Sequence, residues 1–269
     1  MDNREWTKLA IVEFLGPFAL CFMGIGAIIQ THLNGGSGDI VAIALAHGLG
    51  IGLLVAAAGH ISGGVYNPAL TIGLLVTRRI DRQRAIVYIV AQCLGGLAAC
   101  GALTLVYRDV DRNRDGVNLG VPAVGANHSV WNALGMEFIL TFFLMFVVFG
   151  VAIDNRTGGR AVAALAIGLT ITMDVLAGGA ISGAIMNPAR WIGPAIIQGD
   201  FSDFWIWIVG PVAGAVVAAV IYNDVLLAGT PAGAAPSDRI DPEHPRAVVE
   251  SEVRQEAAER SRRARRRGR

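Results

Sequence analysis

The sequence contains few charged residues. Asp, Glu, Lys and Arg make up 16% of its 269 residues, whereas soluble domains average about 25%. Hydrophobic residues reach 54%, and the formal net charge is only +1. The composition is typical of a membrane protein, and the balanced charge gives the chain as a whole no attraction for nucleic acid.

Cysteine is also scarce. The three cysteines, Cys21, Cys93 and Cys100, all fall within long apolar runs, and an odd number in such places excludes a disulfide framework and a cysteine metal site. The apolar runs contain no paired acids, no metal-ligand spacing and no nucleophile with a base. We therefore expect no enzyme activity, no cofactor and no metal.

Long uncharged runs are what the sequence has in abundance. A helix of about 20 apolar residues crosses the roughly 30 Å of hydrocarbon in a bilayer. Six runs of this kind predict six transmembrane helices in a multi-pass protein of the cell membrane. They cover residues 9–30, 40–59, 85–106, 130–153, 161–177 and 204–227.

Basic residues predict how these helices are oriented, because short loops rich in Lys and Arg stay in the cytoplasm. Such residues occur at the N-terminus and in every second loop, which places both termini in the cytoplasm. The residues concerned are Arg4, Lys8, Arg78, Arg79, Arg82, Arg84, Arg156 and Arg160.

The chain is internally duplicated. Residues 59–69 read GHISGGVYNPA and residues 179–189 read GAISGAIMNPA. Each copy has three spans, which is an odd number, so the second copy must enter the membrane inverted relative to the first. Inverted repeats of this kind share a site near the bilayer midplane. We divide the chain into a first repeat (1–120), a second repeat (121–229) and a polar tail (230–269).

Each repeat contains a helix too short to cross the membrane. The apolar runs after the two Asn-Pro-Ala sequences predict half-helices over 67–76 and 187–197, each about 13 to 15 Å long at 1.5 Å per residue. Asn is a preferred N-cap, and Pro is favoured at the first helical position. Two such helices can meet tip to tip at the midplane.

These two motifs, on short helices between six spans, resemble the aquaporin or major intrinsic protein family over about residues 9–227. The resemblance implies an all-α membrane fold with six transmembrane helices and two re-entrant half-helices in an inverted 3+3 repeat. It also implies a passive channel for water and other small neutral solutes, which excludes protons and ions and assembles as a homotetramer. The motif residues are Asn67, Pro68, Ala69, Asn187, Pro188 and Ala189.

The resemblance further implies a narrow constriction formed by His47, Val175, Ala184 and Arg190. This set is most similar to that of plant tonoplast intrinsic proteins, which pass water together with ammonia, urea or glycerol. Val and Ala are small, so we expect a wider opening than in a strict water filter. His128 in the outer loop is a candidate for an extended filter.

The family also has buried acids that accept hydrogen bonds from the re-entrant loops. Glu13 and Glu137 match them, and His60, Ser62 and Ser182 are the loop residues expected to take part in the bracing.

Two residues leave the solute open. Trp191 follows Arg190 where water channels have Ser and glycerol facilitators Asp, and Asp174, expected to be exposed at the outer mouth, has no family counterpart. One alternative is an aquaglyceroporin-type facilitator with glycerol or another small solute as main substrate. A second is an ion-coupled secondary transporter, since inverted repeats with broken helices also build those.

The polar tail ends in SRRARRRGR. Its composition predicts a disordered cytoplasmic segment. Its arginines either bind anionic lipid of the bilayer or are simply solvated.

Overall fold

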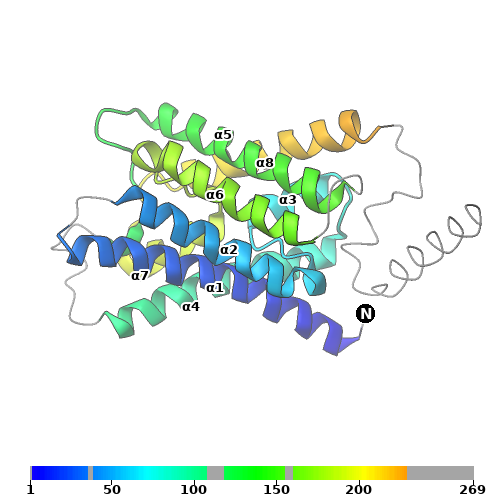
Figure 1. The fold of residues 1–269 in the computed structure, drawn as a ribbon, viewed down its shortest axis with the longest axis horizontal. Helices are drawn as coiled ribbons and strands as arrows, with labels where there is room; N and C mark the ends of the chain where they lie inside the picture. Colours follow the sequence, from blue (N-terminus) through cyan, green and yellow to red (C-terminus); the bar gives the residue numbers. More distant parts are fainter. Residues whose placement is uncertain (1, 36–38, 108–117, 155–159, 229–269) are drawn as a thin grey trace, which may run out of the picture.

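The computed structural model describes residues 2–35, 39–107, 118–154 and 160–228, which form a helical bundle without any strand (Figure 1). Six of its helices are long and apolar enough to cross a membrane, and this confirms the predicted fold class. These helices are α1 (Asn3–Leu33), α2 (Ile40–Ser62), α4 (Arg82–Val106), α5 (Val130–Val148), α6 (Arg160–Ser182) and α8 (Ile206–Ile221).

Five shorter elements complete the described chain. Two are the half-helices, which run within a residue of their predicted bounds, and two are π-helical turns that extend α5 and α8. The fifth is a 3₁₀ turn between α4 and α5, which the sequence pattern does not predict. They are α3 (Pro68–Val76), α7 (Pro188–Gln198), η2 (Phe149–Ile153), η3 (Tyr222–Leu226) and η1 (Asn118–Gly120).

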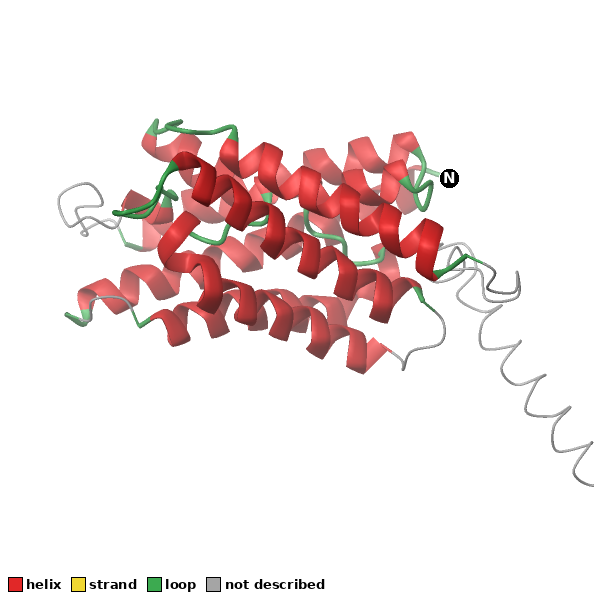
Figure 2. Ribbon diagram, turned by 90° about the horizontal axis from the view of Figure 1, so that it is seen from above, coloured by secondary structure: helices red, strands yellow, loops and turns green. Residues whose placement is uncertain are grey.

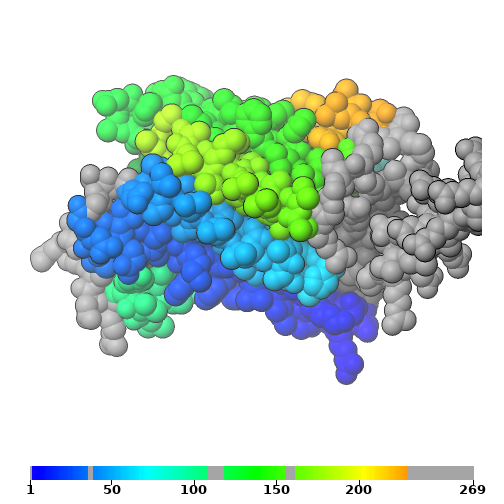
Figure 3. All heavy atoms as spheres, in the orientation of Figure 1, coloured from blue at the N-terminus to red at the C-terminus, as the bar shows by residue number. Residues whose placement is uncertain are grey.

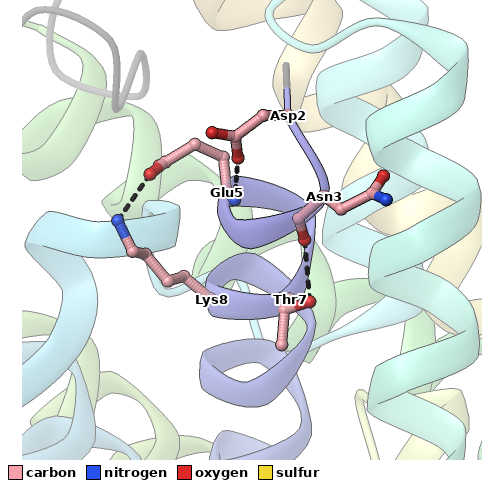
Figure 4. A network of polar contacts seen from close by, with 5 residues as sticks. All are labelled: Asp2, Asn3, Glu5, Thr7 and Lys8. Carbon is pink, nitrogen blue, oxygen red and sulfur yellow. Dashed lines mark hydrogen bonds and ion pairs between the residues drawn. The ribbon is translucent and has the colours of Figure 1, made fainter.

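Helix α1 begins at Asn3, well before the predicted apolar run of 9–30. The side chain of Asp2 caps it by accepting a hydrogen bond from the Glu5 backbone N–H at 2.8 Å, and Lys8 pairs with Glu5 one turn on (Figure 4). Such caps and i,i+3 pairs stabilise a helix end in water. Hydropathy marks the part of a helix that lies in lipid, whereas capping decides where the helix starts.

The outer surface of the bundle is apolar. Figure 3 shows α1, α2, α6 and α5 side by side on one face. Leu49 and Leu53 of α2 and Leu165 and Leu169 of α6 are each more than half exposed. Soluble proteins rarely expose so many large apolar side chains to water. In a membrane the same side chains contact lipid.

The two repeats meet where α2 packs against α6. A Cβ atom on Gly48 would lie 2.4 Å from the carbonyl oxygen of Gly168, and one on Gly168 would lie 2.8 Å from that of Gly48. These two glycines are 120 residues apart and therefore occupy the same position in the two copies. Small residues allow membrane helices to approach closely, and here they do so at the symmetry axis of the duplication.

The half-helices lie inside the bundle, where Figure 2 shows their loops between the long helices. Helix α3 of the first repeat packs against α8 of the second, and α7 of the second packs against α4 of the first. The two repeats thus complete each other. The proposed tail, 230–269, lies outside the described residues.

Candidate functional site

The two Asn-Pro-Ala motifs begin the half-helices. Asn67 and Asn187 are the N-caps, and a proline follows each at the first helical position. Each asparagine Oδ1 accepts a hydrogen bond from the backbone N–H two residues on, at 2.9 Å in both cases. The same local chemistry therefore starts both helices.

The asparagines also tie the two motifs to each other. Asn67 Nδ2 donates to the carbonyl oxygen of Met186, and Asn187 Nδ2 donates to that of Tyr66, both at 2.9 Å. Tyr66 and Met186 adopt the left-handed backbone conformation, each with φ of 53°. The amino ends of α3 and α7, each equivalent to about half a positive charge, thus converge at one place.

A buried glutamate holds the first re-entrant loop. Glu13, fully buried in α1, accepts hydrogen bonds from Ser62 Oγ, from the backbone N–H groups of Val65 (3.1 Å) and Tyr66 (2.8 Å), and from Gln92 Nε2 (2.7 Å). The carboxylate satisfies backbone groups that no helix or strand pairs, which is what extended chain inside a membrane protein requires.

The second loop is held in the same way. Glu137, fully buried in α5, accepts hydrogen bonds from Ser182 Oγ at 2.7 Å and from the backbone N–H groups of Ile185 (2.8 Å) and Met186 (2.7 Å). The three donors stand 120 residues after Ser62, Val65 and Tyr66. We call each set, a glutamate with its serine and two loop N–H groups, a glutamate brace.

Two further hydrogen bonds hold the re-entrant loops, and the sequence pattern does not predict them. Tyr88 Oη donates to the carbonyl oxygen of Ser62, and Trp207 Nε1 donates to that of Ser182 at 2.9 Å. His60, in contrast, is exposed in the last turn of α2, and its side chain makes no hydrogen bond within the described chain, so the structure shows no bracing of the loop by His60. The sequence does contain a signal for the first two contacts, since Tyr88 and Trp207 are polar aromatic residues in the third span of each repeat.

His47, one of the residues assigned to the constriction, is held by a hydrogen bond to its own helix. Its Nδ1 lies 2.8 Å from the carbonyl oxygen of Ile43, and since a carbonyl only accepts, Nδ1 carries the proton. The ring lies against α1, where a Cβ on Gly24 would come within 2.4 Å of Nε2. The side chain is 6% exposed.

Val175 and Ala184 are also almost buried, at 3% and 4% exposure. Ala184 lies in the second re-entrant loop with a φ of 48°, and its N–H lies 3.3 Å from Ser182 Oγ. The small side chain suits a left-handed position, where larger or branched residues are strained.

Arg190 lies in the first turn of α7 and is 4% exposed. Its Nη1 donates to the carbonyl oxygen of Gly120, in the η1 turn, at 2.7 Å. His128, the outer-loop residue singled out by the sequence analysis, is exposed, and its backbone N–H donates to the carbonyl of Gly125. Among the described residues of this loop, Gly120 and not His128 is the one that bonds Arg190.

Asp174 corrects an expectation. It is 1% exposed rather than open to solvent, and its Oδ2 has no hydrogen-bond partner within the described chain. It lies on the face of α6 that packs against α5, because Gly178, one turn on, contacts Leu140, and it interacts electrostatically with Glu137.

Trp191 is buried as well. Its indole packs against the rings of Phe201 and Phe204, with centroid distances of 6.1 and 6.4 Å. It belongs to an apolar cluster that includes Ile185 and Trp207. The side chain after Arg190 thus serves the packing of α7 against its neighbours.

Comparison with known proteins agrees with this geometry. Residues 1–222 match the family model described as major intrinsic protein. Aquaporin NIP1-1 of Oryza sativa subsp. japonica is 42% identical, with 82% of this chain and 75% of that protein covered. Aquaporin TIP4-4 of Zea mays is 39% identical, with 82% and 87% covered.

A solved structure is similar too. The aquaglyceroporin from Plasmodium falciparum is 27% identical and superposes with a TM-score of 0.76, over 82% of this chain and 97% of that one. Since NIP and TIP aquaporins both occur among the relatives, the special likeness of the constriction to tonoplast proteins stays a prediction. The chain belongs to the major intrinsic protein family, a family of channels and not of enzymes, and it is a passive multi-pass membrane channel for water and small solutes.

Proposed function

We propose that the channel conducts water together with other small neutral solutes, such as glycerol, urea or ammonia, and excludes protons and ions. Solutes pass the two Asn-Pro-Ala tips at the bilayer midplane and then a constriction nearer the outer face. The constriction consists of His47, Val175, Ala184 and Arg190.

The observation that carries this proposal is the hydrogen bonding of the two asparagines. An amide nitrogen has two hydrogens, and the cross-bond between the motifs uses one on each side chain. The second N–H of Asn67 and of Asn187 is left to donate to a passing oxygen. Both side chains are 4% exposed, whereas Glu13 and Glu137 are completely buried.

Exclusion of protons follows from the same pair of donors. A water molecule that accepts from both asparagines turns its hydrogens outward, which interrupts the chain of hydrogen bonds that a proton would use. Positive half-helix ends that repel cations are an established feature of aquaporin-type pores, and α3 and α7 supply two.

The range of solutes depends on the constriction. Val175 and Ala184 have small side chains, which leaves room beside Arg190. The guanidinium of Arg190 has five N–H donors, and one of them donates to the carbonyl oxygen of Gly120. The remaining donors suit a hydroxyl or carbonyl oxygen. The solved relative is called an aquaglyceroporin, and a facilitator with glycerol as its main substrate is the alternative within the family.

The setting in the cell is proposed from the sequence. Basic residues in alternate loops favour cytoplasmic termini, and we propose the cell membrane as the location. From the family we propose a homotetramer embedded in the lipid bilayer. We propose no nucleic-acid partner.

Stopped-flow light scattering on proteoliposomes tests the proposal. We expect Arg190→Val to raise the ratio of glycerol to water permeability by about threefold to tenfold, which corresponds to roughly 0.6 to 1.4 kcal/mol in relative barrier height. Leu70→Val is the matched control, because Leu70 holds the same position in the other half-helix, and its ratio should equal that of the wild type. An unchanged ratio in Arg190→Val would refute the placement of the arginine.

The same vesicles separate the alternatives. Glycerol flux that exceeds water flux in the unmodified protein favours the glycerol facilitator. Flux that saturates, or that needs a proton or sodium gradient, favours the ion-coupled transporter.

A further inference from the structure

The η1 turn, Asn118–Gly120, has a conformation that its sequence alone does not favour. All three residues have positive φ values, of 42°, 47° and 67°. Glycine adopts this region readily and asparagine tolerates it, but leucine is strained there. Contacts with the rest of the protein must hold the turn, and it lies against α1 and α7.

Leu119 provides the first contact. Its side chain is completely buried in an apolar cluster with Ile25 and Ile29 of α1 and Leu103 of α4. Because Leu119 packs between two transmembrane helices, it fixes the middle of the turn. The burial of its apolar surface offsets the backbone strain.

Gly120 provides the second contact. Its carbonyl oxygen accepts the hydrogen bond from Arg190, and a Cβ at this position would lie 3.3 Å from Ile25 and 3.4 Å from Arg190 Nη2. The absence of a side chain therefore lets the backbone approach the guanidinium closely. Between described residues the structure contains a single ion pair, Lys8–Glu5, so Arg190 is held by a neutral carbonyl and not by a salt bridge.

Asn118 provides the third contact. Its Nδ2 donates to Asp200 Oδ2 at 3.2 Å, while Asp200 Oδ1 accepts from the backbone N–H of Ser202 at 3.0 Å. Asp200 directly follows Gly199, the C-cap of α7. The turn thus touches α7 near both ends, at Arg190 in its first turn and just beyond its last residue.

We propose that the η1 turn positions Arg190 and thereby sets the size limit of the channel, with the Asn118–Asp200 hydrogen bond and the buried Leu119 as its two anchors. The proposal deepens the proposed function and rests on it, since it assumes that Arg190 lines the constriction. If either anchor is lost, the Gly120 carbonyl moves, the guanidinium gains freedom, and larger solutes pass more easily relative to water.

An exchange of the two partners tests the first anchor. Asn118→Asp places a second carboxylate opposite Asp200 and should raise the glycerol-to-water permeability ratio roughly threefold. The double variant Asn118→Asp with Asp200→Asn restores a donor opposite an acceptor, so the ratio should return to within about 1.5-fold of the wild type. Such rescue is the sign of direct coupling.

Leu119→Ala tests the second anchor and should raise the ratio by a similar factor. Asn132→Ala is the control, because it also removes a side-chain hydrogen bond, but one within the capping box of α5 and not in the η1 turn. Its ratio should not change. Each anchor variant is then repeated with Arg190→Val, where it should add nothing if the turn acts through the arginine.

The outcomes separate the two proposals. If Arg190→Val changes the ratio but Asn118→Asp and Leu119→Ala do not, the positioning role is wrong and the constriction stands. If Arg190→Val itself has no effect, the proposed function fails first. Anchor variants that lower water permeability and recovery of folded protein without changing the ratio indicate a merely structural turn and also overturn the inference.

Discussion

The two re-entrant halves of the channel are alike where they hold the backbone and different where a solute would be selected. Both have a glutamate brace and an asparagine cap. One turn beyond the asparagine, however, the first half has Leu70 and the second has Arg190. Features retained in both copies of the duplication build the fold, and the feature present in one copy makes the two mouths unequal.

The braces differ in how the carboxylate is completed. In the first half Gln92 Nε2 donates a fourth hydrogen bond to Glu13. The matching position of the second repeat is Pro211, which has no side-chain donor, because Tyr88 corresponds to Trp207 and Gly95 to Gly214. Glu137 instead has a weak electrostatic attraction to Arg190. The second brace is therefore linked to Arg190, the arginine that we propose for the constriction, whereas the first brace has no such link.

Removal of a brace should have the largest effect. Glu13→Ala leaves four buried donors unpaired and Glu137→Ala leaves three, at about 1 to 3 kcal/mol for each group. We expect both variants to lose at least about 3 kcal/mol of stability, with Glu13→Ala the more severe. Thermal unfolding of the purified protein in detergent measures this.

Single-donor variants show whether the brace is the cause. Ser62→Ala and Ser182→Ala each remove one hydrogen bond to a glutamate and should cost about 1 kcal/mol each. A glutamate variant no less stable than its serine partner would mean that the buried carboxylates do not hold the loops.

Much of this arrangement could be predicted from the sequence, because it depends on local chemistry repeated twice. The Asn-Pro start and the length of the apolar run define each half-helix to within a residue. The η1 turn could not be predicted in this way. Its left-handed Leu119 is stabilised by α1 and α4, and its Gly120 by Arg190, which are contacts far away in the sequence.

Which face of each long helix is buried could not be predicted from the sequence either. A transmembrane helix is apolar toward both lipid and protein, so hydrophobic periodicity does not reveal which side is buried. Asp174 was therefore expected at the outer mouth and is found between α6 and α5, and His60 was expected at the loop and is exposed.

Loss of either asparagine side chain should have the next largest effect. Asn67→Ala and Asn187→Ala each remove a cap, worth about 1 kcal/mol, and a buried cross-bond, worth about another 1 kcal/mol. Because the two sites have the same bonds at the same lengths, the destabilisation should agree within about 0.5 kcal/mol. Thermal unfolding compares them, and one neutral variant would show that the symmetry is only geometrical.

Acid should affect the two halves differently, because Asp200 accepts a hydrogen bond from the η1 turn, whereas Asp81, the corresponding residue of the first repeat, caps α4. Hydrogen bonds from Ser202, and a weaker one from Asn118, hold the pKa of Asp200 below its ordinary value. The anchor is thus fully present above about pH 4, the usual range for Asp, and is lost as the pH falls through the lowered pKa.

The permeability ratio of glycerol to water should accordingly stay constant from about pH 8 to pH 5 and rise only below about pH 4. Stopped-flow measurements across this range test it, with Asn132→Ala as a control that should show the same profile as the wild type. A change between about pH 6 and 7 would contradict this and indicate a histidine.

The smallest effect is expected at Asp174, whose counterpart in the first repeat is Leu54. A buried carboxylate oxygen without a partner costs free energy, and an uncharged amide of the same shape costs less. Asp174→Asn should therefore raise the stability by up to about 1 kcal/mol and leave water and glycerol permeability unchanged. A large loss of permeability in a normally folded variant would instead place Asp174 in the transport path, and selection would then involve α6 as well as α7.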